Sequence, residues 1–360
     1  MNLISLLIVV ALALVMSWFG TYCVIKFAYK YGLYDKPNAR KIHHEKIPRL
    51  GGVSFFPLGV IIIDLLSQLA PVLGVHDFPD VSVLVGLVPA LLLLYVVGLI
   101  DDIWGVRYRI KFLFQAAVAI LLCLNGYYYH DLYGLIGLHE VPTWLGWLVT
   151  VFMVIYVTNA FNFIDGIDGL SSGLAILTFA YFACFFSELG NEVFMIVCVI
   201  MPLILIPFMF YNVFGHSDKH TKVFMGDAGS LFLGLIFVIL SIELSQHSVP
   251  EAGGDNLLLF SVAPLLLPLL DVIQVVVHRL RTGANPFQAD KSHIHHRCMA
   301  FGWTQHVTLF IVITFAVILT TLCYFLAYVL DINVVLAIVI VVWLVFNGLL
   351  SRKKINKNMI

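Results

Sequence analysis

The residues best suited to chemistry lie between positions 159 and 170, where the chain reads NAFNFIDGIDGL. Four polar side chains recur there at every third position: Asn159, Asn162, Asp165 and Asp168. On a helix this spacing predicts one slowly drifting polar stripe, with Gly166 and Gly169 loosening the backbone beside it. An ionised carboxylate in hydrocarbon costs several kcal/mol unless it is paired or binds a metal, so such a stripe inside a membrane indicates a functional site.

A carboxylate pair, Asp101 and Asp102, ends a long apolar run. Adjacent carboxylates repel each other, so the pair requires a metal ion or nearby cations, although a solvated helix end would also tolerate it. Arg107 and Lys111 follow the pair and would share one face of a helix, where they can clamp phosphate oxygens. A second part of the site is therefore predicted here.

A third motif, KVFMGDAGS at 222–230, places Asp227 between Gly226 and Gly229 just before an apolar helix. An Asp that opens a helix can hold a metal while the neighbouring backbone amides face a phosphate. A glycine–Asp turn is common by itself. Its weight here comes from its expected place on the same membrane face as the other carboxylates.

The fourth motif is RLRTGANPFQADKSHIHHR at 279–297, which ends in a histidine cluster followed by Arg297. The histidines are His293, His295 and His296. Their spacing matches no common structural zinc site, and hydrogen bonding to a polyanion suits them better. In the preceding apolar run Asp271 follows two prolines, which predict a kinked helix that turns this carboxylate toward protein or water.

The basic stretch at 35–52 reads DKPNARKIHHEKIPRLGG. Its cations either obey the rule that orients membrane proteins or draw in a phosphorylated substrate, and both interpretations stay open.

The composition explains why these polar motifs stand out. Hydrophobic residues make up 61% of the chain, charged residues 11%, and the mean hydropathy is +1.00, which together predict an all-α polytopic membrane protein. About eleven membrane helices are expected, the first of them retained rather than cleaved as a signal peptide. They lie near 1–25, 51–72, 81–100, 110–126, 142–160, 171–187, 191–211, 227–246, 256–278, 306–329 and 332–350. The six cysteines indicate no disulfide framework.

The basic residues predict the orientation of these helices. All 20 Lys and Arg fall in alternate loops, which places the amino terminus outside and the carboxyl terminus in the cytoplasm. Residues 1–360 then form a single integral membrane domain. Its active-site loops are expected on the cytoplasmic side, near 30–50, 101–111, 161–170, 212–227 and 279–305.

Carboxylates, amides, histidines and cations gathered at one membrane face favour magnesium-assisted phosphoryl chemistry. Mg²⁺ prefers a few carboxylate or amide oxygens together with substrate phosphates, and the cations neutralise the remaining phosphate charge. A site at the membrane surface would let a water-soluble nucleotide meet a lipid phosphate.

The combined motifs resemble the polyprenyl-phosphate N-acetylhexosamine-1-phosphate transferase superfamily (glycosyltransferase family 4) from about residue 30 to 300. Within it the sequence is most similar to the bacterial undecaprenyl-phosphate N-acetylglucosamine-1-phosphate transferases, which begin lipopolysaccharide and other cell-surface polysaccharides. The phospho-MurNAc-pentapeptide transferases share the aspartates but typically carry three histidines in a row. Here Ile294 interrupts that run, which favours the N-acetylglucosamine branch.

The resemblance implies transfer of a sugar 1-phosphate from UDP-N-acetylglucosamine, or a close UDP-N-acetylhexosamine, to undecaprenyl phosphate, with release of UMP. It implies Mg²⁺, with Mn²⁺ as a substitute, held by Asp227 and Asn162, and a catalytic role for Asp101 or Asp102 on the lipid phosphate. Asp165 and Asp168 would also be catalytic, near the nucleotide. Substrate-binding roles fall to Lys111, Asn159, His293, His295, His296 and Arg297. Direct attack by the lipid phosphate is favoured over a phosphoryl-enzyme intermediate.

The resemblance also implies the bacterial cytoplasmic (inner) membrane, a lipid bilayer as partner and no nucleic acid, and it leaves a homodimer open. A phospho-MurNAc-pentapeptide transferase of peptidoglycan synthesis is the alternative function. A secondary transporter is a further rival class, but its polar site should lie near the bilayer centre and open to both sides. An intramembrane aspartyl protease is disfavoured by the Arg, His and Asn beside Asp227.

Overall fold

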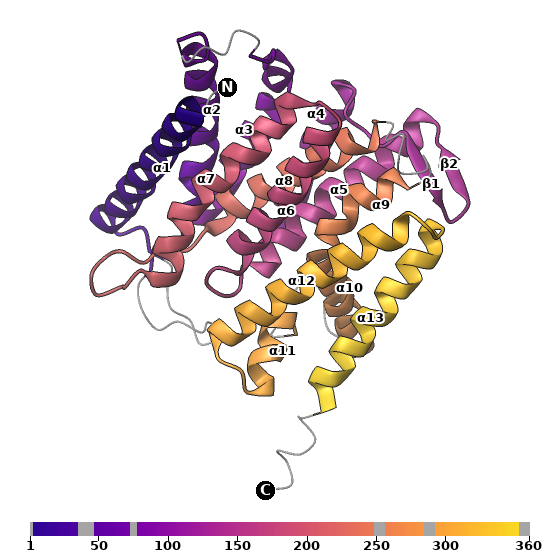
Figure 1. Cartoon of the computed structure of the whole chain (residues 1–360). Helices are drawn as coiled ribbons and strands as arrows, with labels where there is room; N and C mark the ends of the chain where they lie inside the picture. Colours follow the sequence, from indigo (N-terminus) through magenta and orange to yellow (C-terminus); the bar gives the residue numbers. More distant parts are fainter. Residues whose placement is uncertain (1–2, 35–46, 73–77, 248–255, 284–291, 353–360) are drawn as a thin grey trace, which may run out of the picture.

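The computed structural model describes residues 3–34, 47–72, 78–247, 256–283 and 292–352. These residues form a bundle of long apolar helices (Figure 1). The first half contains α1 (Leu3–Tyr31), the 3-10 turn η1 (Gly51–Ser54), α2 (Phe55–Leu69), α3 (Ser82–Trp104), α4 (Tyr108–Leu124) and α5 (Thr143–Ile164). The second half contains α6 (Leu170–Glu188), α7 (Glu192–Phe214), α8 (Gly226–Ser245), α9 (Leu257–Val262), η3 (Ala263–Leu265), α10 (Leu266–Arg281), α11 (Ile294–Phe301), α12 (Gln305–Ala327) and α13 (Ile332–Arg352).

Ten helical segments within the described residues are long and apolar enough to cross a membrane. The remaining predicted span, 110–126, corresponds to the shorter helix α4 of 17 residues. A mostly helical polytopic membrane protein is thus confirmed. The number eleven and the orientation of the two termini stay predictions.

Two features refine the predicted helices. The apolar run at 256–278 is broken into α9 and α10 by the turn η3, which contains Pro264, so the predicted kink is present. A short antiparallel hairpin of β1 (Asp131–Leu135) and β2 (Leu138–Glu140) follows α4. This hairpin lies at the opposite end of the bundle from α11 and the carboxyl end of α13 (Figure 1).

Helix α8 is the axis of the bundle, because nearly all of its side chains are buried. Glycines allow its neighbours to approach closely, as in many membrane helix pairs. A Cβ atom built on Gly98 of α3 would lie 2.6 Å from Ala228 Cα, and one built on Gly234 would lie 2.6 Å from Thr158 Cα of α5. Helices α3 and α5 are therefore both held directly against α8.

Candidate active site

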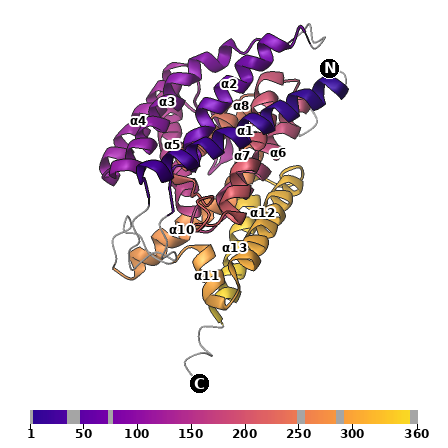
Figure 2. The ribbon, with the colours of Figure 1, turned by 90° about the vertical axis from the view of Figure 1, so that its left-hand side faces the viewer.

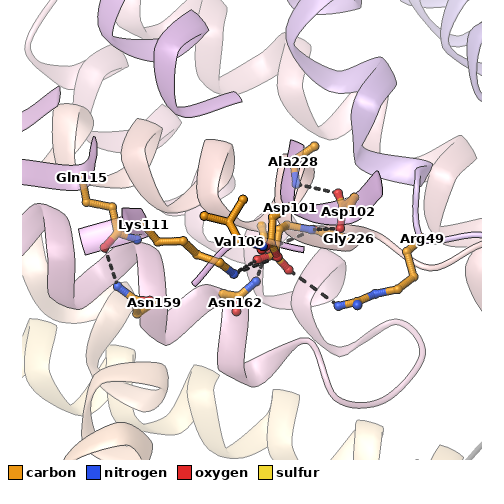
Figure 3. A network of polar contacts seen from close by, with 12 residues as sticks. Arg49, Asp101, Asp102, Val106, Lys111, Gln115, Asn159, Asn162, Gly226 and Ala228 are labelled. Carbon is orange, nitrogen blue, oxygen red and sulfur yellow. Dashed lines mark hydrogen bonds and ion pairs between the residues drawn. The ribbon is translucent and has the colours of Figure 1, made fainter. Parts of the chain in front are cut away.

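Three charged side chains from the ends of three helices lie together in the polar network of Figure 3. The ammonium of Lys111 donates to Asp101 Oδ2 at 2.8 Å and to Asp227 Oδ2 at 2.5 Å. Asp101 lies in the last turn of α3, Lys111 in the first turn of α4, and Asp227 in the first turn of α8. The Asp227 side chain is only 5% exposed, so this cluster is a buried charge network.

Arg49 adds a second cation, with Nη2 at 3.6 Å from Asp227 Oδ1 (Figure 3). Its position follows from close backbone contacts between η1 and the 222–230 segment. Gly51 and Gly52 donate backbone N–H groups to Phe224 O at 2.9 Å and Met225 O at 2.8 Å. The glycines at the end of the 35–52 stretch thus fix a cation beside the carboxylates.

Asp102 faces away from this cluster and caps α8. Its Oδ1 accepts from the backbone N–H of Asp227 at 2.8 Å, and its Oδ2 accepts from that of Ala228 at 2.9 Å. A carboxylate at a helix amino terminus satisfies free N–H groups and complements the helix dipole. The two adjacent carboxylates therefore have different surroundings, although their sequence does not distinguish them.

The predicted polar stripe is correct only as far as Ile164. Helix α5 ends there, and residues 165–169 form turns, so the prediction that all four polar residues share one helix face is wrong. The cause is glycine: Gly169 adopts a left-handed φ of 80°, which other residues rarely take. The stripe instead divides between the helix and the following turn.

The two asparagines stay on α5 and bind neighbouring helices (Figure 3). Asn159 Nδ2 donates to Gln115 Oε1 of α4 at 2.9 Å. Asn162 Nδ2 donates to Ser230 Oγ at 2.9 Å, one helical turn from Asp227. Asn162 therefore lies beside the carboxylates, whereas Asn159 is one turn further into the bundle.

The two aspartates after α5 have separate partners. Asp168 Oδ2 accepts from Lys222 Nζ at 2.6 Å, and this lysine also donates to the backbone carbonyl of Asn212. Asp165 is partly buried, and desolvation raises its pKa to about 7; Arg49 acts in the opposite direction, and the nearby carboxylates of Asp168 and Asp227 add to the rise. Lys222 was visible in the third motif but received no role from the sequence.

Asp271 organises the histidine segment. Its Oδ2 lies 2.8 Å from His293 Nδ1, and its Oδ1 accepts from the backbone N–H of Ile294 at 2.8 Å. Asp271 is 1% exposed, so the dyad is buried between α10 and α11. The sequence indicated that this carboxylate faces protein or water, but it did not connect Asp271 with His293.

His295 joins the histidine segment to the turn after α5. A Cβ atom on Gly166 would lie 2.1 Å from His295 Nε2, so the ring packs directly on this glycine. Burial lowers the pKa of His295 well below its usual value, and His296 and His293 contribute. Its Nδ1 has no hydrogen-bond partner among the described residues.

Arg297 turns toward α13. Its Nη1 lies 2.5 Å from Asn347 Oδ1, and its Nη2 donates to Asn347 O at 2.8 Å. Its predicted role in substrate binding stays a prediction. The basic residues between 35 and 46, and Lys291, lie outside the described residues.

The donor set agrees with a magnesium site, although no group of three or more His, Cys, Asp or Glu side chains within the described residues has metal-ligand spacing. Asp101 and Asp227 converge on a single ammonium, so a cation is already required between them. Mg²⁺ typically takes one or two carboxylates and completes its shell with water and phosphate oxygens. Two carboxylates with a nearby amide suit this requirement.

The fold and the site together define the class: an integral membrane protein made of helices, with a cluster of ion-paired carboxylates where several of the helices end. Sequence comparisons make the assignment more specific. The model of the family described as glycosyl transferase family 4 matches residues 84–245, which include the carboxylate cluster.

Full-length relatives extend this match. A protein of Yersinia pestis named undecaprenyl-phosphate alpha-N-acetylglucosaminyl 1-phosphate transferase is 32% identical over 88% of this chain and 82% of its own length. The protein of the same name from Escherichia coli (strain K12) is 32% identical over 81% of this chain and 75% of its own. A Bacillus subtilis (strain 168) protein, named as a probable undecaprenyl-phosphate N-acetylglucosaminyl 1-phosphate transferase, is 31% identical over 81% and 76%. The chain belongs to glycosyl transferase family 4.

Proposed function

We propose that this protein transfers N-acetylglucosamine 1-phosphate from UDP-N-acetylglucosamine to undecaprenyl phosphate and releases UMP. The observation that carries the proposal is the convergence of Asp101 and Asp227 on Lys111, because such a cluster can receive phosphate groups and a divalent cation. The names of the relatives, which span most of this chain, support the lipid and sugar assignments. They favour this function over a phospho-MurNAc-pentapeptide transferase or a transporter.

The metal in this proposal is Mg²⁺, with Mn²⁺ as a substitute, and it would be held by Asp227 and the neighbouring Asn162. When bound, it would neutralise diphosphate charge and align the two substrates. Lys111 and Arg49 flank the same carboxylates, so they can bind the phosphate oxygens that remain.

Asp101 is the better candidate to hold the proton of the lipid phosphate. Both oxygens of Asp102 accept from backbone amides of α8, whereas only Oδ1 of Asp101 accepts from a backbone amide, that of Val106, and its Oδ2 accepts from the side chain of Lys111. A carboxylate that exchanges its partner can orient a substrate oxygen, and a capping carboxylate cannot do so without releasing the helix. The lipid phosphate then attacks the sugar phosphate directly, and UMP leaves.

The remaining predicted residues surround this centre. Asp165 and Asp168 lie in the turn beside it and would contact the nucleotide. His293 and His295, positioned by Asp271 and Gly166, would donate hydrogen bonds to the diphosphate or the sugar, with His296 and Arg297 next to them.

The direct test incubates purified protein with undecaprenyl phosphate, Mg²⁺ and a panel of UDP-sugars, and measures UMP release. Release with UDP-N-acetylglucosamine is expected. Release only with UDP-MurNAc-pentapeptide would identify the alternative branch, and no release with any sugar would contradict a transferase. EDTA should abolish turnover and added Mg²⁺ should restore it; activity that persists in EDTA would remove the metal from the proposal.

We also propose that the site faces the cytoplasm of the bacterial inner membrane. The hairpin at the opposite end exposes Ile136 to 79%, and the helix end beside Asp101 exposes Trp104 to 75%. The exposed Cys23 and Cys184 are first replaced by serine, and the buried cysteines are kept. One new cysteine is then introduced at position 136 or at position 104 and labelled with an impermeant maleimide. Labelling at 136 in intact cells, and at 104 only after lysis, is expected, and the reverse pattern would invert the orientation.

A further inference from the structure

A buried lysine, Lys222, lies outside the cluster of Asp101, Lys111 and Asp227 and has no role in the transfer proposed above. It stands in the segment between α7 and α8, where its side chain is 10% exposed. Helix α1 packs along α7 (Figure 2), and near the end of α1 the hydroxyl of Tyr29 donates to the backbone carbonyl of Lys222 at 3.3 Å. The backbone of this lysine is therefore held in place by a further helix.

The side chain of Lys222 reaches the turn that follows α5. Its Nζ donates to Asp168 Oδ2 at 2.6 Å and to the backbone carbonyl of Asn212, in the last turn of α7. Asn212 contacts the same turn through its own amide. Its Oδ1 accepts from the backbone N–H of Gly169 at 2.7 Å, and its Nδ2 donates to the carbonyl of Val223 at 2.9 Å. Asn212 thus ties the backbone of the turn to the segment before α8.

The ion pair between Lys222 and Asp168 adds little to this anchor. Asn212 already binds the backbone of the turn, and Gly166 of the same turn packs against His295. A buried ion pair must overcome the desolvation of two charges, and its net contribution to stability is often small. The stability of the turn therefore does not explain why a charged pair is buried here.

The surroundings of Asp168 provide an explanation. Asp165, in the same turn, interacts electrostatically with both Arg49 and Asp227, so the turn lies close to the carboxylate cluster. Lys222 occupies Oδ2 of Asp168, and Oδ1 accepts no hydrogen bond from the described residues. A carboxylate without its cation at this place would repel the diphosphate of a nucleotide-sugar. Lys222 balances that charge and leaves the second oxygen of Asp168 for a donor group of the nucleotide.

We propose that Lys222 is a positioning residue for the nucleotide-sugar, and that it acts through Asp168, whose carboxylate it orients and neutralises. This inference rests on the proposed function, in which Asp168 contacts the nucleotide. The side-chain hydrogen bonds of Lys222 go to Asp168 and Asn212 and not to the cluster at Lys111. Loss of the lysine should therefore weaken the nucleotide-sugar and leave undecaprenyl phosphate unaffected.

The test measures the Kd of UDP-N-acetylglucosamine for the purified full chain with Mg²⁺ by isothermal titration calorimetry, and the KM of undecaprenyl phosphate by UMP release. Lys222→Gln should raise the Kd of the nucleotide-sugar about tenfold, a typical coupling between residues in contact, and leave the KM of the lipid unchanged. The matched control Lys219→Gln removes an exposed cation from the same segment and should change neither value. A lysine that serves only stability would lower the melting temperature and leave the Kd as in wild type, which would overturn the proposal.

A double variant tests whether the lysine acts through Asp168. Without the carboxylate there is nothing for the lysine to orient, so adding Lys222→Gln to Asp168→Asn should change the Kd of the nucleotide-sugar by less than about twofold. This comparison carries the test if Lys222→Gln alone, which leaves a buried carboxylate unpaired, does not fold. A further large rise of the Kd in the double variant would overturn the proposal. Wild-type protein that binds no UDP-N-acetylglucosamine would instead remove the proposed function, and this inference with it.

Discussion

The two ends of helix α8 hold polar clusters of opposite character. At its amino end Asp227 accepts from the ammonium of Lys111. Near its carboxyl end the hydroxyl of Tyr129 donates to Ser241 Oγ at 2.8 Å, Ser241 donates to Ser261 Oγ at 3.0 Å, and Ser261 donates to the carbonyl of Leu258. Both clusters are buried, but one consists of charges and the other of neutral hydroxyls.

The difference separates function from architecture. The hydroxyl chain ends on a backbone carbonyl, so every donor is satisfied inside the protein and the cluster needs no outside ligand. The charged cluster is costly to desolvate, and its charges are balanced by a single side chain, the ammonium of Lys111. A buried polar cluster therefore indicates a functional site when it is built from charges rather than from neutral groups that satisfy one another.

The largest effect should follow from Asp227→Asn, which removes one charge from the cluster at the amino end of α8. We expect kcat to fall at least about a hundredfold, as when charge stabilisation of a transition state is lost. Ser241→Ala, at the other end of the same helix, should leave kcat unchanged. UMP release by purified variants with confirmed melting transitions measures both, and wild-type turnover in Asp227→Asn would remove the distinction between the two ends.

Asp271→Asn should have a smaller effect, because it acts through His293. The asparagine can still accept from the N–H of Ile294 but no longer gives His293 an anionic partner, so kcat/KM is expected to drop about tenfold, as for other carboxylates that orient a histidine. The same substitution at Asp64, an exposed carboxylate on α2, is the control. A lower melting temperature with unchanged kcat/KM and an unchanged pH profile would show that Asp271 has only a structural role.

A pH effect is expected from Asp165. The pKa of this carboxyl is 3.8 when it is exposed and about 7 in the folded protein, so between these values the folded state keeps a proton that the unfolded state has lost. Its contribution to stability therefore declines as the pH rises through this window and is fully lost above it. Melting in EDTA between about pH 5 and about pH 8 should show a smaller decline for Asp165→Asn than for wild type; identical curves would contradict the raised pKa.

The smallest effect should come from Tyr129→Phe in the hydroxyl chain. Removal of one hydrogen bond should lower the free energy of unfolding by about 1 kcal/mol and leave kcat unchanged. Chemical denaturation in detergent and the UMP assay provide the two measurements. A loss of activity without a loss of stability would show that the neutral cluster also takes part in function.

Much of the fold could be predicted from the sequence, because membrane helices are set by the length of apolar runs. The convergence of the motifs could also be predicted, since Asp101, Lys111 and Asp227 fall at the ends of runs that alternate in direction. The structure brings these three together as expected.

What could not be predicted depends on contacts between helices. A period of three residues does not show where a helix ends, so the break after Ile164 was missed, although Gly166 and Gly169 were the available signal. Whether Asp101 or Asp102 caps α8 depends on how the end of α3 is rotated against it. The dyad of Asp271 and His293 joins residues 22 positions apart, and no local pattern specifies it.

The close packing at Gly98 has a consequence for how this protein can fail. The space left for a side chain there is smaller than one methyl group, since a Cβ atom would meet Ala228 Cα at 2.6 Å. Any larger residue must push α3 from α8, and Asp101 would move away from Asp227 with it. The alignment of the carboxylates thus depends on the absence of a side chain at Gly98, and a single added carbon there would misalign them.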